Sequence, residues 1–353
     1  MRIDIACGGT GGHTFPGVAT AFELRRRGHD ITLWLAGKGV EHQTAQGWDG
    51  PVQAVNVHAS GGSLGGNLGS VMRLALAVVP AWRKLRRNRP DVMLAMGSYA
   101  CVAPALAARL SCIPLILHEA NVVPGAAVKL LSRFARETAT HFEETARYLP
   151  GCRCAHTGFP VRPEFLSVQR QSHEGFTLLV AGGSQGAHAL NECVPEALEH
   201  LKSRGLSCRV IHLAGTRDCD TVASRYDAAG ISHDTRAFMP DIWNAYASAD
   251  LAVMRAGAAT CAELAICGLP ALLVPYPYAA RDHQRANAQV LASADSVDVI
   301  DQNALSSRWL ADYLEKYIRE PHRLVARREA LARLAVPDAA SRLAERIEAL
   351  GGI

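Results

Sequence analysis

A glycine loop near the start of the chain holds the residues best suited to chemistry. The loop runs from Gly8 to His13 (GGTGGH), after an apolar run at 3–6 and before a helical pattern at 16–27. Four glycines in five positions let backbone N–H groups approach a ligand closely, and the positive end of the next helix favours an anionic group. The His13 imidazole could reach that ligand. The spacing is not GxGxxG, which argues against a dinucleotide site, and a tight turn with a solvated histidine is the alternative.

A second strand end, from Met254 to Glu263 (MRAGAATCAE), predicts a nucleotide site. Small residues at 256–259 leave the backbone exposed, and the following helix offers free N–H groups to a phosphate. The Glu263 carboxylate could accept hydrogen bonds from two ribose hydroxyls. The alternative is a capping box, in which Thr260 and Glu263 only satisfy backbone donors. The later stretch DHQRAN at 282–287 favours the ligand site, because side-chain amides at a helix start can bind nucleotide and sugar hydroxyls.

Two further motifs carry acidic side chains. The loop from His118 to Asn121 (HEAN) ends an apolar run at 115–117 and lacks the second histidine of HExxH, which argues against a zinc protease. Its adjacent His and Glu could orient a hydroxyl, or the segment could only cap the next helix. The DxD triplet at 218–220 lies in a polar stretch away from a strand end, and we interpret it as polar surface.

The elements that must position these loops alternate between strand and helix. Apolar strands are predicted at 3–6, 31–35, 92–95 and 115–117, with helices at 16–27, 70–87, 103–110 and 126–135. After Gly175 the pattern restarts with a strand at 176–181, a second glycine turn from Gly182 to Gly186 (GGSQG) and a helix at 187–202. Later strands are predicted at 208–213, 251–254, 271–275 and 297–300. Two βα-repeating halves predict two facing, doubly wound α/β domains with the ligand in the cleft between them. The connection is expected near 160–175, and the last helix, at about 339–349, could join either half.

Composition narrows the function classes. The 353 residues exceed one ordinary domain, and 49% hydrophobic with 20% charged residues is typical of a soluble globular protein. A formal net charge of +4 is too small to indicate a nucleic-acid partner. The ten cysteines form no CxxC pair, which indicates reduced thiols in the cytoplasm and no zinc site. We find no signal sequence and no uncharged apolar run of the ~18 residues that a spanning helix needs.

Residues 64–89 combine an apolar helical pattern with a basic end that contains five basic residues in seven. This combination suits an anionic membrane surface, with Leu64 and Leu68 inserting. The other residues expected at that surface are Trp82, Arg83, Lys84, Arg86 and Arg87. The alternative is a core-facing helix with a solvated basic end.

Taken together, the motifs resemble the MurG family of N-acetylglucosamine transferases. GGTGGHxFPG, MGxY, HExN-x-x-PG, PVR at 160–162, GGSQGAxxLN, RxGAxTxxEL and DHQxxNA occur in the family's order over nearly the whole chain. The resemblance implies an α/β fold of the GT-B class, two facing Rossmann-like domains with a deep interdomain cleft. Residues 1–162 would bind the acceptor and the membrane, with the helix at about 339–353 able to pack back on them. Residues 163–338 would bind the UDP-sugar.

The resemblance also implies the reaction and the substrate sites. N-acetylglucosamine would move, with inversion, from UDP-N-acetylglucosamine to the C4 hydroxyl of undecaprenyl-diphosphate-N-acetylmuramyl-pentapeptide, in peptidoglycan synthesis. In the donor site Glu263 would bind the ribose and the Met239 main chain the uracil. The remaining donor residues would be Arg162, Ser184, Gln185, Ala258, Ala259, Thr260, Gln284 and Asn287. Gly9, Thr10, Gly11 and Asn121 would face the sugar and the acceptor.

His13 is the candidate general base, since a helix N-terminus disfavours imidazolium and keeps the ring able to accept a proton. Glu119 and Asn121 are the other candidate catalytic residues. The resemblance implies no required cofactor, allows stimulation by a divalent cation, and implies peripheral attachment to the cytoplasmic face of the inner membrane. Other proteins of cell-wall synthesis would be partners.

Three positions depart from the family pattern. Ser98 lies in a loop that commonly reads GGYxSGP, Ala120 replaces the glutamine of HEQN, and Phe159 replaces the asparagine of NPVR. These departures lie within residues 1–162, the acceptor half, so a transferase for a different lipid acceptor stays open. A UDP-sugar epimerase of the same fold and a non-catalytic nucleotide-sugar-binding subunit stay open as well.

Overall fold

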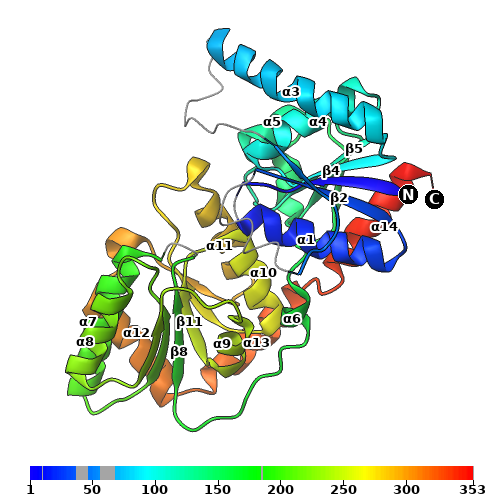
Figure 1. The fold of residues 1–353 in the computed structure, drawn as a ribbon. Coiled ribbons are helices and arrows are strands. Elements are labelled where there is room, and N and C mark those ends of the chain that lie inside the picture. Colours follow the sequence, from blue (N-terminus) through cyan, green and yellow to red (C-terminus); the bar gives the residue numbers. More distant parts are fainter. Residues whose placement is uncertain (10, 37–46, 56–67, 184–185, 353) are drawn as a thin grey trace. The chain divides into compact units, whose positions relative to one another are not determined.

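The computed structural model describes residues 1–353 apart from 10, 37–46, 56–67, 184–185 and 353. The described residues form two compact units, Met1–Arg162 with Val336–Ile353, and Pro163–Ala335. Figure 1 shows a parallel sheet with flanking helices in each of them.

The first unit contains a seven-stranded parallel sheet with the order β3-β2-β1-β4-β5-β6-β7. Its strands are β1 Arg2–Ala6, β2 Asp30–Leu35, β3 Val52–Ala54, β4 Val92–Ala95, β5 Leu115–Glu119, β6 Glu137–Thr140 and β7 Cys154–His156. Its helices are α1 Gly11–Arg26, α3 Leu68–Asn88, α4 Val102–Leu110, α5 Ala126–Leu131 and α14 Ala339–Gly351, with 3-10 turns at Tyr99–Cys101 and Glu143–Tyr148.

Helices cover both faces of this sheet. Met93 and Ala95 in β4 pack with side chains of α3, α4 and α5, whereas Val92 and Leu94 pack with side chains of α1 and α14. A strand that is covered on both sides must be apolar at every position, which explains the uninterrupted hydrophobic runs in the sequence.

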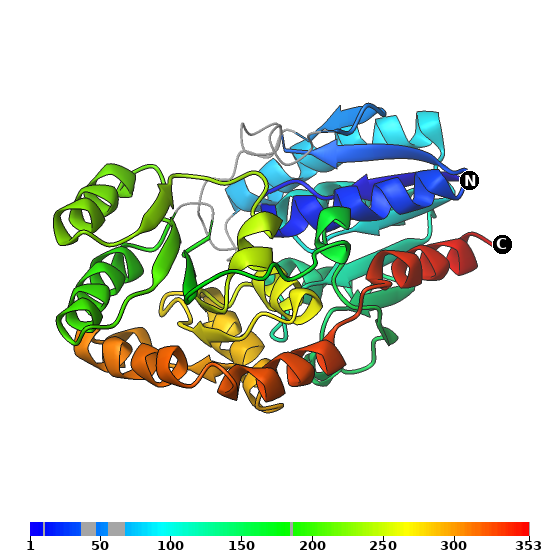
Figure 2. The same cartoon turned by 90° about the horizontal axis from the view of Figure 1, so that it is seen from below.

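The last helix, α14, belongs to the first unit and lies beside α1 (Figure 2). Its Leu343 and Ile347 are fully buried. Glu348 accepts hydrogen bonds from Arg27 Nη1 at 2.7 Å and from His29 Nε2 at 2.8 Å. Arg346 holds the buried carboxylate of Glu137 in β6 through two nitrogens. Burial and ion pairing thus fix the end of the chain onto the first sheet.

The second unit contains a six-stranded parallel sheet with the order β10-β9-β8-β11-β12-β13. Its strands are β8 Thr177–Ala181, β9 Arg209–Leu213, β10 His233–Arg236, β11 Leu251–Met254, β12 Ala271–Leu273 and β13 Asp298–Val299. Its helices are α6 Pro163–Leu166, α7 His188–Ser203, α8 Cys219–Ala229, α9 Trp243–Ser248, α10 Ala258–Cys267, α11 His283–Ala292, α12 Ser307–Arg319 and α13 Arg323–Leu334, with 3-10 turns at Ala280–Asp282 and Gln302–Ala304.

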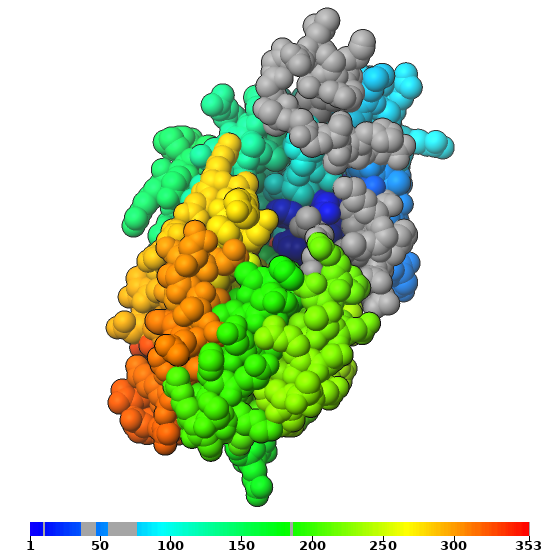
Figure 3. Space-filling model, turned by 90° about the vertical axis from the view of Figure 1, so that its left-hand side faces the viewer, coloured from blue at the N-terminus to red at the C-terminus, as the bar shows by residue number. Residues whose placement is uncertain are grey.

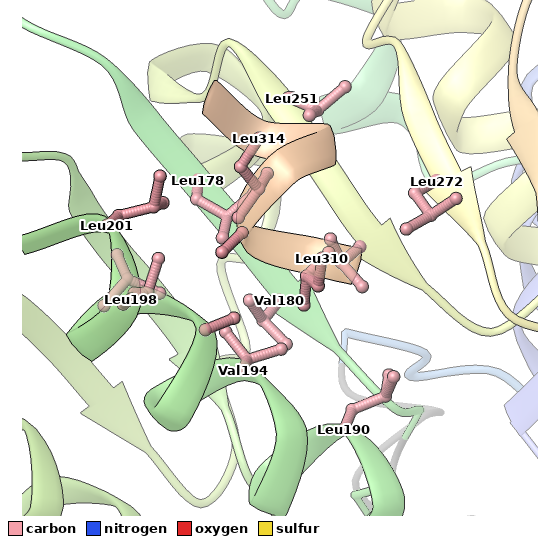
Figure 4. Packing of buried hydrophobic residues seen from close by; sticks show 14 of the residues in the cluster. Leu178, Val180, Leu190, Val194, Leu198, Leu201, Leu251, Leu272, Leu310 and Leu314 are labelled. Atoms are coloured by element: carbon pink, nitrogen blue, oxygen red, sulfur yellow. The ribbon is translucent and has the colours of Figure 1, made fainter. Parts of the chain in front are cut away.

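The core of this unit lies between β8, α7 and α12 (Figure 4). Leu178 and Val180 of β8 share one buried cluster with Leu190 and Val194 of α7 and Leu310 of α12, and Figure 4 shows Val180 beside Val194. The helices α7 and α12 pack side by side, and Figure 3 shows their green and orange surfaces adjoining.

Both sheets are doubly wound, and each has a switch point at which the strand order reverses. The switch lies between β1 and β4 in the first unit and between β8 and β11 in the second. Ligands of such sheets bind beyond the carboxyl ends of the strands at this point. The two glycine loops follow β1 and β8, so the topology places each of them at a switch point.

The predicted α/β class is confirmed, and so are most of the predicted elements. Two helix boundaries differ from the prediction by more than two residues. Helix α1 begins at Gly11, five residues earlier than expected, because glycine does not prevent a helix that packs closely on a strand, and α5 ends at Leu131 and not at 135. His13 therefore lies in the first turn of α1. Strands β3, β6, β7 and β10 were not predicted, since their sequences (VQA, ETAT, CAH and HDTR) contain no long apolar run.

Candidate functional site

Three loops meet at the carboxyl ends of β1, β4 and β5 in the first unit. Ser98 Oγ, in the loop after β4, donates a hydrogen bond to the Gly8 carbonyl in the loop after β1. Gly9 has a φ of +129°, and a Cβ there would lie 3.2 Å from Ser98 Cβ. Gly97 has a φ of +81°, and a Cβ there would lie 3.0 Å from the His118 carbonyl oxygen. The loops are therefore in contact, and glycine is required at both positions.

His13 is held by the close packing of α1 on β1. Thr14 Oγ1 donates to the Cys7 carbonyl at 3.0 Å, and a Cβ on Gly17 would lie only 2.4 Å from Cys7 Cβ. His13 is half-buried in the first turn, next to Gly11 and Gly9. Thr10 lies outside the described residues.

His118, which the sequence predicted could orient a hydroxyl together with Glu119, is a fully buried neighbour of His13. Its Nε2 donates to the Gly158 carbonyl at 3.0 Å, which leaves Nδ1 without the proton. Burial, together with a smaller effect of the nearby His13, lowers the pKa of His118 to about 4. His118 is therefore neutral near pH 7, and no positive charge from it opposes proton uptake by His13.

Glu119 organises the loop that carries Asn121. Glu119 Oε1 accepts hydrogen bonds from the backbone N–H of Asn121 at 2.8 Å and from its Nδ2 at 3.2 Å, and Oε2 accepts from the Gly125 N–H at 2.9 Å. Burial raises the pKa of Glu119, and these donors oppose that rise. Thr145 Oγ1 also donates to the Asn121 carbonyl at 3.1 Å. Asn121 is thus fixed on both its backbone and its side chain.

The residues that depart from the family pattern lie in the same region of the first unit. Ala120 is buried, and the buried Phe159 ring contacts His118 edge-on, with ring centroids 6.2 Å apart. Phe159 also contacts His141, with centroids 5.6 Å apart. Arg162 lies over the ring of Phe15, 4.7 Å from its centroid. Phe159 therefore supplies an apolar surface where an asparagine would supply hydrogen-bonding groups.

The second unit places the predicted nucleotide residues at its own switch point. Gly257 caps α10, which begins with Ala258, Ala259 and Thr260. The capping-box alternative is wrong, because Thr260 lies inside the helix and no side chain caps it. The half-buried Glu263 instead accepts a hydrogen bond from the Tyr246 hydroxyl at 3.0 Å. Its carboxylate is thus oriented by a tyrosine that the sequence did not point to.

The loop after β12 is fixed by residues on both sides. Gln284 Oε1 accepts from the Tyr276 backbone N–H at 2.9 Å, and the fully buried Asn287 donates to the Ala256 carbonyl at 3.2 Å. Arg255 is also buried and donates to the Val274 carbonyl at 3.0 Å. Burial lowers the pKa of Arg255. Sequence reasoning gave Arg255 no role of its own, although it is the first residue of the RxGAxTxxEL motif.

Two other predicted donor positions follow β8 and β10. Ser184 and Gln185 of the second glycine turn lie outside the described residues. Gly186 in that turn has a φ of +76°, and its N–H donates to the Gly183 carbonyl at 3.0 Å. Met239 lies between β10 and α9, with its side chain buried. His13, Glu119 and Asn121 thus lie at the carboxyl ends of β1 and β5, whereas Glu263, Gln284 and Asn287 follow β11 and β12 in the second unit.

Helix α3 carries the predicted membrane residues. Ala81 and Leu85 face the core, whereas Arg83, Arg86 and Arg87 are exposed. Trp82 packs partly against the core, below the Arg86 guanidinium, which lies 5.0 Å from the ring centroid. Lys84 is half-buried over the Trp34 ring. Leu68 is the first residue of α3, and Leu64 lies outside the described residues.

Among the α3 residues whose side chains the structure describes, the apolar Leu76 and Val79 are 68% and 44% exposed. They lie at helical spacing from Arg83 and Arg86, so apolar and basic side chains share one exposed face. Leu76 and Val79 therefore offer more exposed apolar surface to a membrane than Trp82, which packs partly against the core.

Metal and membrane-span searches cover the described part of the chain. There, no group of three or more His, Cys, Asp or Glu side chains could hold a metal ion. Asp218 of the DxD triplet caps α8, and its Oδ2 accepts from Asn191 Nδ2 at 2.8 Å. Within the same residues, no helix is both long and apolar enough to cross a membrane.

Comparison with known proteins identifies the family. Residues 3–140 match the glycosyltransferase family 28 N-terminal domain, and residues 177–343 match the glycosyltransferase family 28 C-terminal domain. The UDP-N-acetylglucosamine--N-acetylmuramyl-(pentapeptide) pyrophosphoryl-undecaprenol N-acetylglucosamine transferase of Alkalilimnicola ehrlichii is 40% identical over 98% of this chain and 97% of its own length. The enzyme of the same name from Anaeromyxobacter dehalogenans is 37% identical over 98% of this chain and 92% of its own length.

A solved structure agrees with the sequence relatives. The crystal structure of Acinetobacter baumannii MurG matches with a TM-score of 0.81 and 27% identity, over 99% of both chains. With its two Rossmann-like units, the chain has the GT-B fold that the sequence predicted. The chain is a member of the MurG family of glycosyltransferases.

Proposed function

We propose that this protein transfers N-acetylglucosamine from UDP-N-acetylglucosamine to the C4 hydroxyl of undecaprenyl-diphosphate-N-acetylmuramyl-pentapeptide, a step of peptidoglycan synthesis. The observation that carries the proposal is 40% identity over 98% of the chain to a transferase of that name. The groups around His13 and Glu263 support it, because each offers the chemistry that one substrate needs.

The donor is bound by the second unit. The first turn of α10 presents free backbone N–H groups behind the small residues Gly257, Ala258 and Ala259, and these bind the diphosphate. Glu263, oriented by Tyr246, accepts hydrogen bonds from the ribose hydroxyls. Gln284, Asn287, Met239 and the second glycine turn complete the donor site.

Proton transfer falls to His13. The acceptor C4 hydroxyl attacks C1 of the donor sugar, the bond from C1 to the UDP oxygen breaks, and the hydroxyl proton passes to His13. Direct displacement inverts the anomeric centre and turns an α-linked donor into a β-1,4 product. Glu119 is the weaker candidate base, since three N–H donors already occupy its carboxylate. Its part is to hold Asn121 against the acceptor.

The departing UDP needs no metal in this proposal. Fixed backbone donors and the positive end of α10 stabilise the diphosphate as it leaves. Turnover should therefore survive a chelator, with any added divalent cation acting only as a stimulant.

The protein acts at the cytoplasmic face of the membrane, where its lipid-linked acceptor lies. The exposed face of α3 supports this, since Leu76 and Val79 adjoin the basic Arg83 and Arg86. Such a face binds an anionic surface reversibly.

The test incubates purified protein with labelled UDP-N-acetylglucosamine and a panel of acceptors. The panel contains undecaprenyl-diphosphate-N-acetylmuramyl-pentapeptide, the same lipid without the peptide, and an unrelated glycolipid. We expect extension of the first acceptor only. Preferred extension of either other lipid would contradict the proposed acceptor, and release of free N-acetylmannosamine and UDP would indicate an epimerase.

A further inference from the structure

A buried chain of hydrogen-bonded side chains lies beneath the second glycine turn. His212 in β9 is fully buried, with Nδ1 2.8 Å from the Tyr226 hydroxyl of α8 and Nε2 3.0 Å from Asn191 Oδ1 of α7. An amide oxygen only accepts, so Nε2 carries the proton and Nδ1 accepts from the tyrosine. Tyr226 therefore donates to His212, and His212 donates to Asn191.

Asn191 connects this chain of hydrogen bonds to the end of β9. Its Nδ2 donates to the Ala214 carbonyl at 2.8 Å and to Asp218 Oδ2 at 2.8 Å. Asp218 also accepts from His188 Nδ1 at 3.0 Å, at the first residue of α7. Asn191 thus ties α7, the end of β9 and the cap of α8 together through one amide.

The Ala214 carbonyl oxygen packs closely against Gly186 of the second glycine turn. A Cβ on Gly186 would lie 2.1 Å from the Ala214 oxygen, so only glycine allows this approach. On the other side of the turn, a Cβ on Gly182 would lie 2.3 Å from the Ala187 nitrogen. Any shift of the Ala214 carbonyl must move Gly186 with it.

Packing alone does not require this chain of polar groups. Leucine and phenylalanine could fill the same volume, and burying polar groups is costly unless every partner is in place. A buried network in which every donor has an acceptor instead fixes its side chains in one arrangement. Burial lowers the pKa of His212 to about 3, so its ring is neutral near pH 7. Its Nδ1 therefore stays an acceptor and its Nε2 stays a donor.

We propose that Tyr226, His212 and Asn191 are positioning residues for the sugar donor. They hold the Ala214 carbonyl, and through it Gly186, in the arrangement from which the second glycine turn binds UDP-N-acetylglucosamine. None of the three touches the donor. The inference rests on the proposed function, because that function supplies the ligand of the turn.

The experiment compares two tyrosine variants that each lose one buried hydroxyl. Tyr226→Phe removes the donor to His212, and we expect the KM for UDP-N-acetylglucosamine and the Kd for UDP to rise ~3–10-fold. The kcat and the KM for the acceptor should stay within twofold of wild type. Tyr317→Phe is the control, because Tyr317 is equally buried in the same unit but donates to Asp298 Oδ2, at 3.1 Å, away from the glycine turn. It should leave all four constants unchanged.

Hydrogen exchange measured by mass spectrometry supplies a readout that needs no catalysis. Amides of the peptide covering 182–190 should exchange faster in Tyr226→Phe and at the wild-type rate in Tyr317→Phe. Unchanged exchange and donor affinity in Tyr226→Phe, or equal changes in both variants, would overturn the inference. A wild-type protein that binds no UDP-sugar would overturn the proposed function, and the exchange comparison would still decide whether the chain of side chains holds the turn.

Discussion

The two glycine loops occupy equivalent places in the two sheets and differ in what surrounds them. Each follows the first strand of its unit and ends in a histidine, His13 in the first loop and His188 just after the second. His13 is half-buried and has the buried, neutral His118 as a neighbour. His188 has an exposed side chain and donates to Asp218 at 3.0 Å. We therefore propose that the first loop serves proton transfer and the second serves ligand binding.

The first test of this comparison replaces His13 and His188 one at a time. His13→Ala should lower turnover by ~10²–10⁴ while donor affinity stays nearly unchanged, because a positioned general base contributes about that factor. His188→Ala is the matched control and should change turnover by no more than about threefold. Steady-state kinetics and calorimetry with UDP measure both. Wild-type turnover in His13→Ala, or an equal loss in both variants, would contradict the assignment of the base.

The second contrast concerns which unit meets the membrane. Reversing Arg83, Arg86 and Arg87 to glutamate should lower binding to anionic vesicles at least ~10²-fold, since each basic residue near such a surface contributes about 1 kcal/mol. Reversing three exposed arginines of the second unit, Arg209, Arg308 and Arg333, is the control and should have a much smaller effect. Vesicle sedimentation measures the difference. Equal losses in the two triple variants would show general charge attraction and no oriented surface.

The third contrast compares how the Glu263 carboxylate of the second unit and the Glu119 carboxylate of the first unit affect UDP affinity. Glu263→Ala should weaken UDP binding ~10–100-fold, because hydrogen bonds to a charged group contribute about 1.5–3 kcal/mol. Glu119→Gln should leave UDP binding unchanged, since Glu119 serves only its own loop in the first unit. Calorimetry with UDP distinguishes the two. Unchanged affinity in Glu263→Ala would leave the carboxylate as a partner of Tyr246 only.

The sequence predicted the strands around both glycine loops because those strands are covered on both faces. Runs such as LLVA in β8 can only be buried, whereas ETAT in β6 has Glu137, which is buried against Arg346 of the distant α14. No local pattern reveals a partner 209 residues away. Pairing of this kind also explains why β6 was not predicted.

The site was predictable where function depends on the residue's own place in a motif. His13, Asn121 and Glu263 were found because each follows a strand end, and their roles remain predictions. Tyr246, His118 and the chain from Tyr226 to Asn191 act through contacts between separate elements. Thr260 and Glu263 have the spacing of a capping box, and only the helix start at Ala258 decides against it. Spacing alone does not reveal where a helix begins.

The last contrast is between buried and exposed histidines as pH falls. Burial lowers the pKa of His118 to about 4 and that of His141 to about 3, from an ordinary 6.5. The unfolded chain takes up protons below pH 6.5 while the folded chain does not, so each ring removes stability as pH falls, by about 2 kcal/mol near pH 5. Asp4 opposes this, because burial raises its pKa to about 6 and its protonation favours the folded state.

His141 is the ring to change, since both its nitrogens are buried without a hydrogen-bond partner among the described residues. His141→Leu should flatten the fall in Tm between pH 7.5 and pH 5 by several degrees, with the contribution of Asp4 unchanged in both proteins. His188→Ala removes an exposed ring and should leave the slope as it is. Differential scanning calorimetry gives the slopes. If His141→Leu keeps the full acid sensitivity, His141 is not its source.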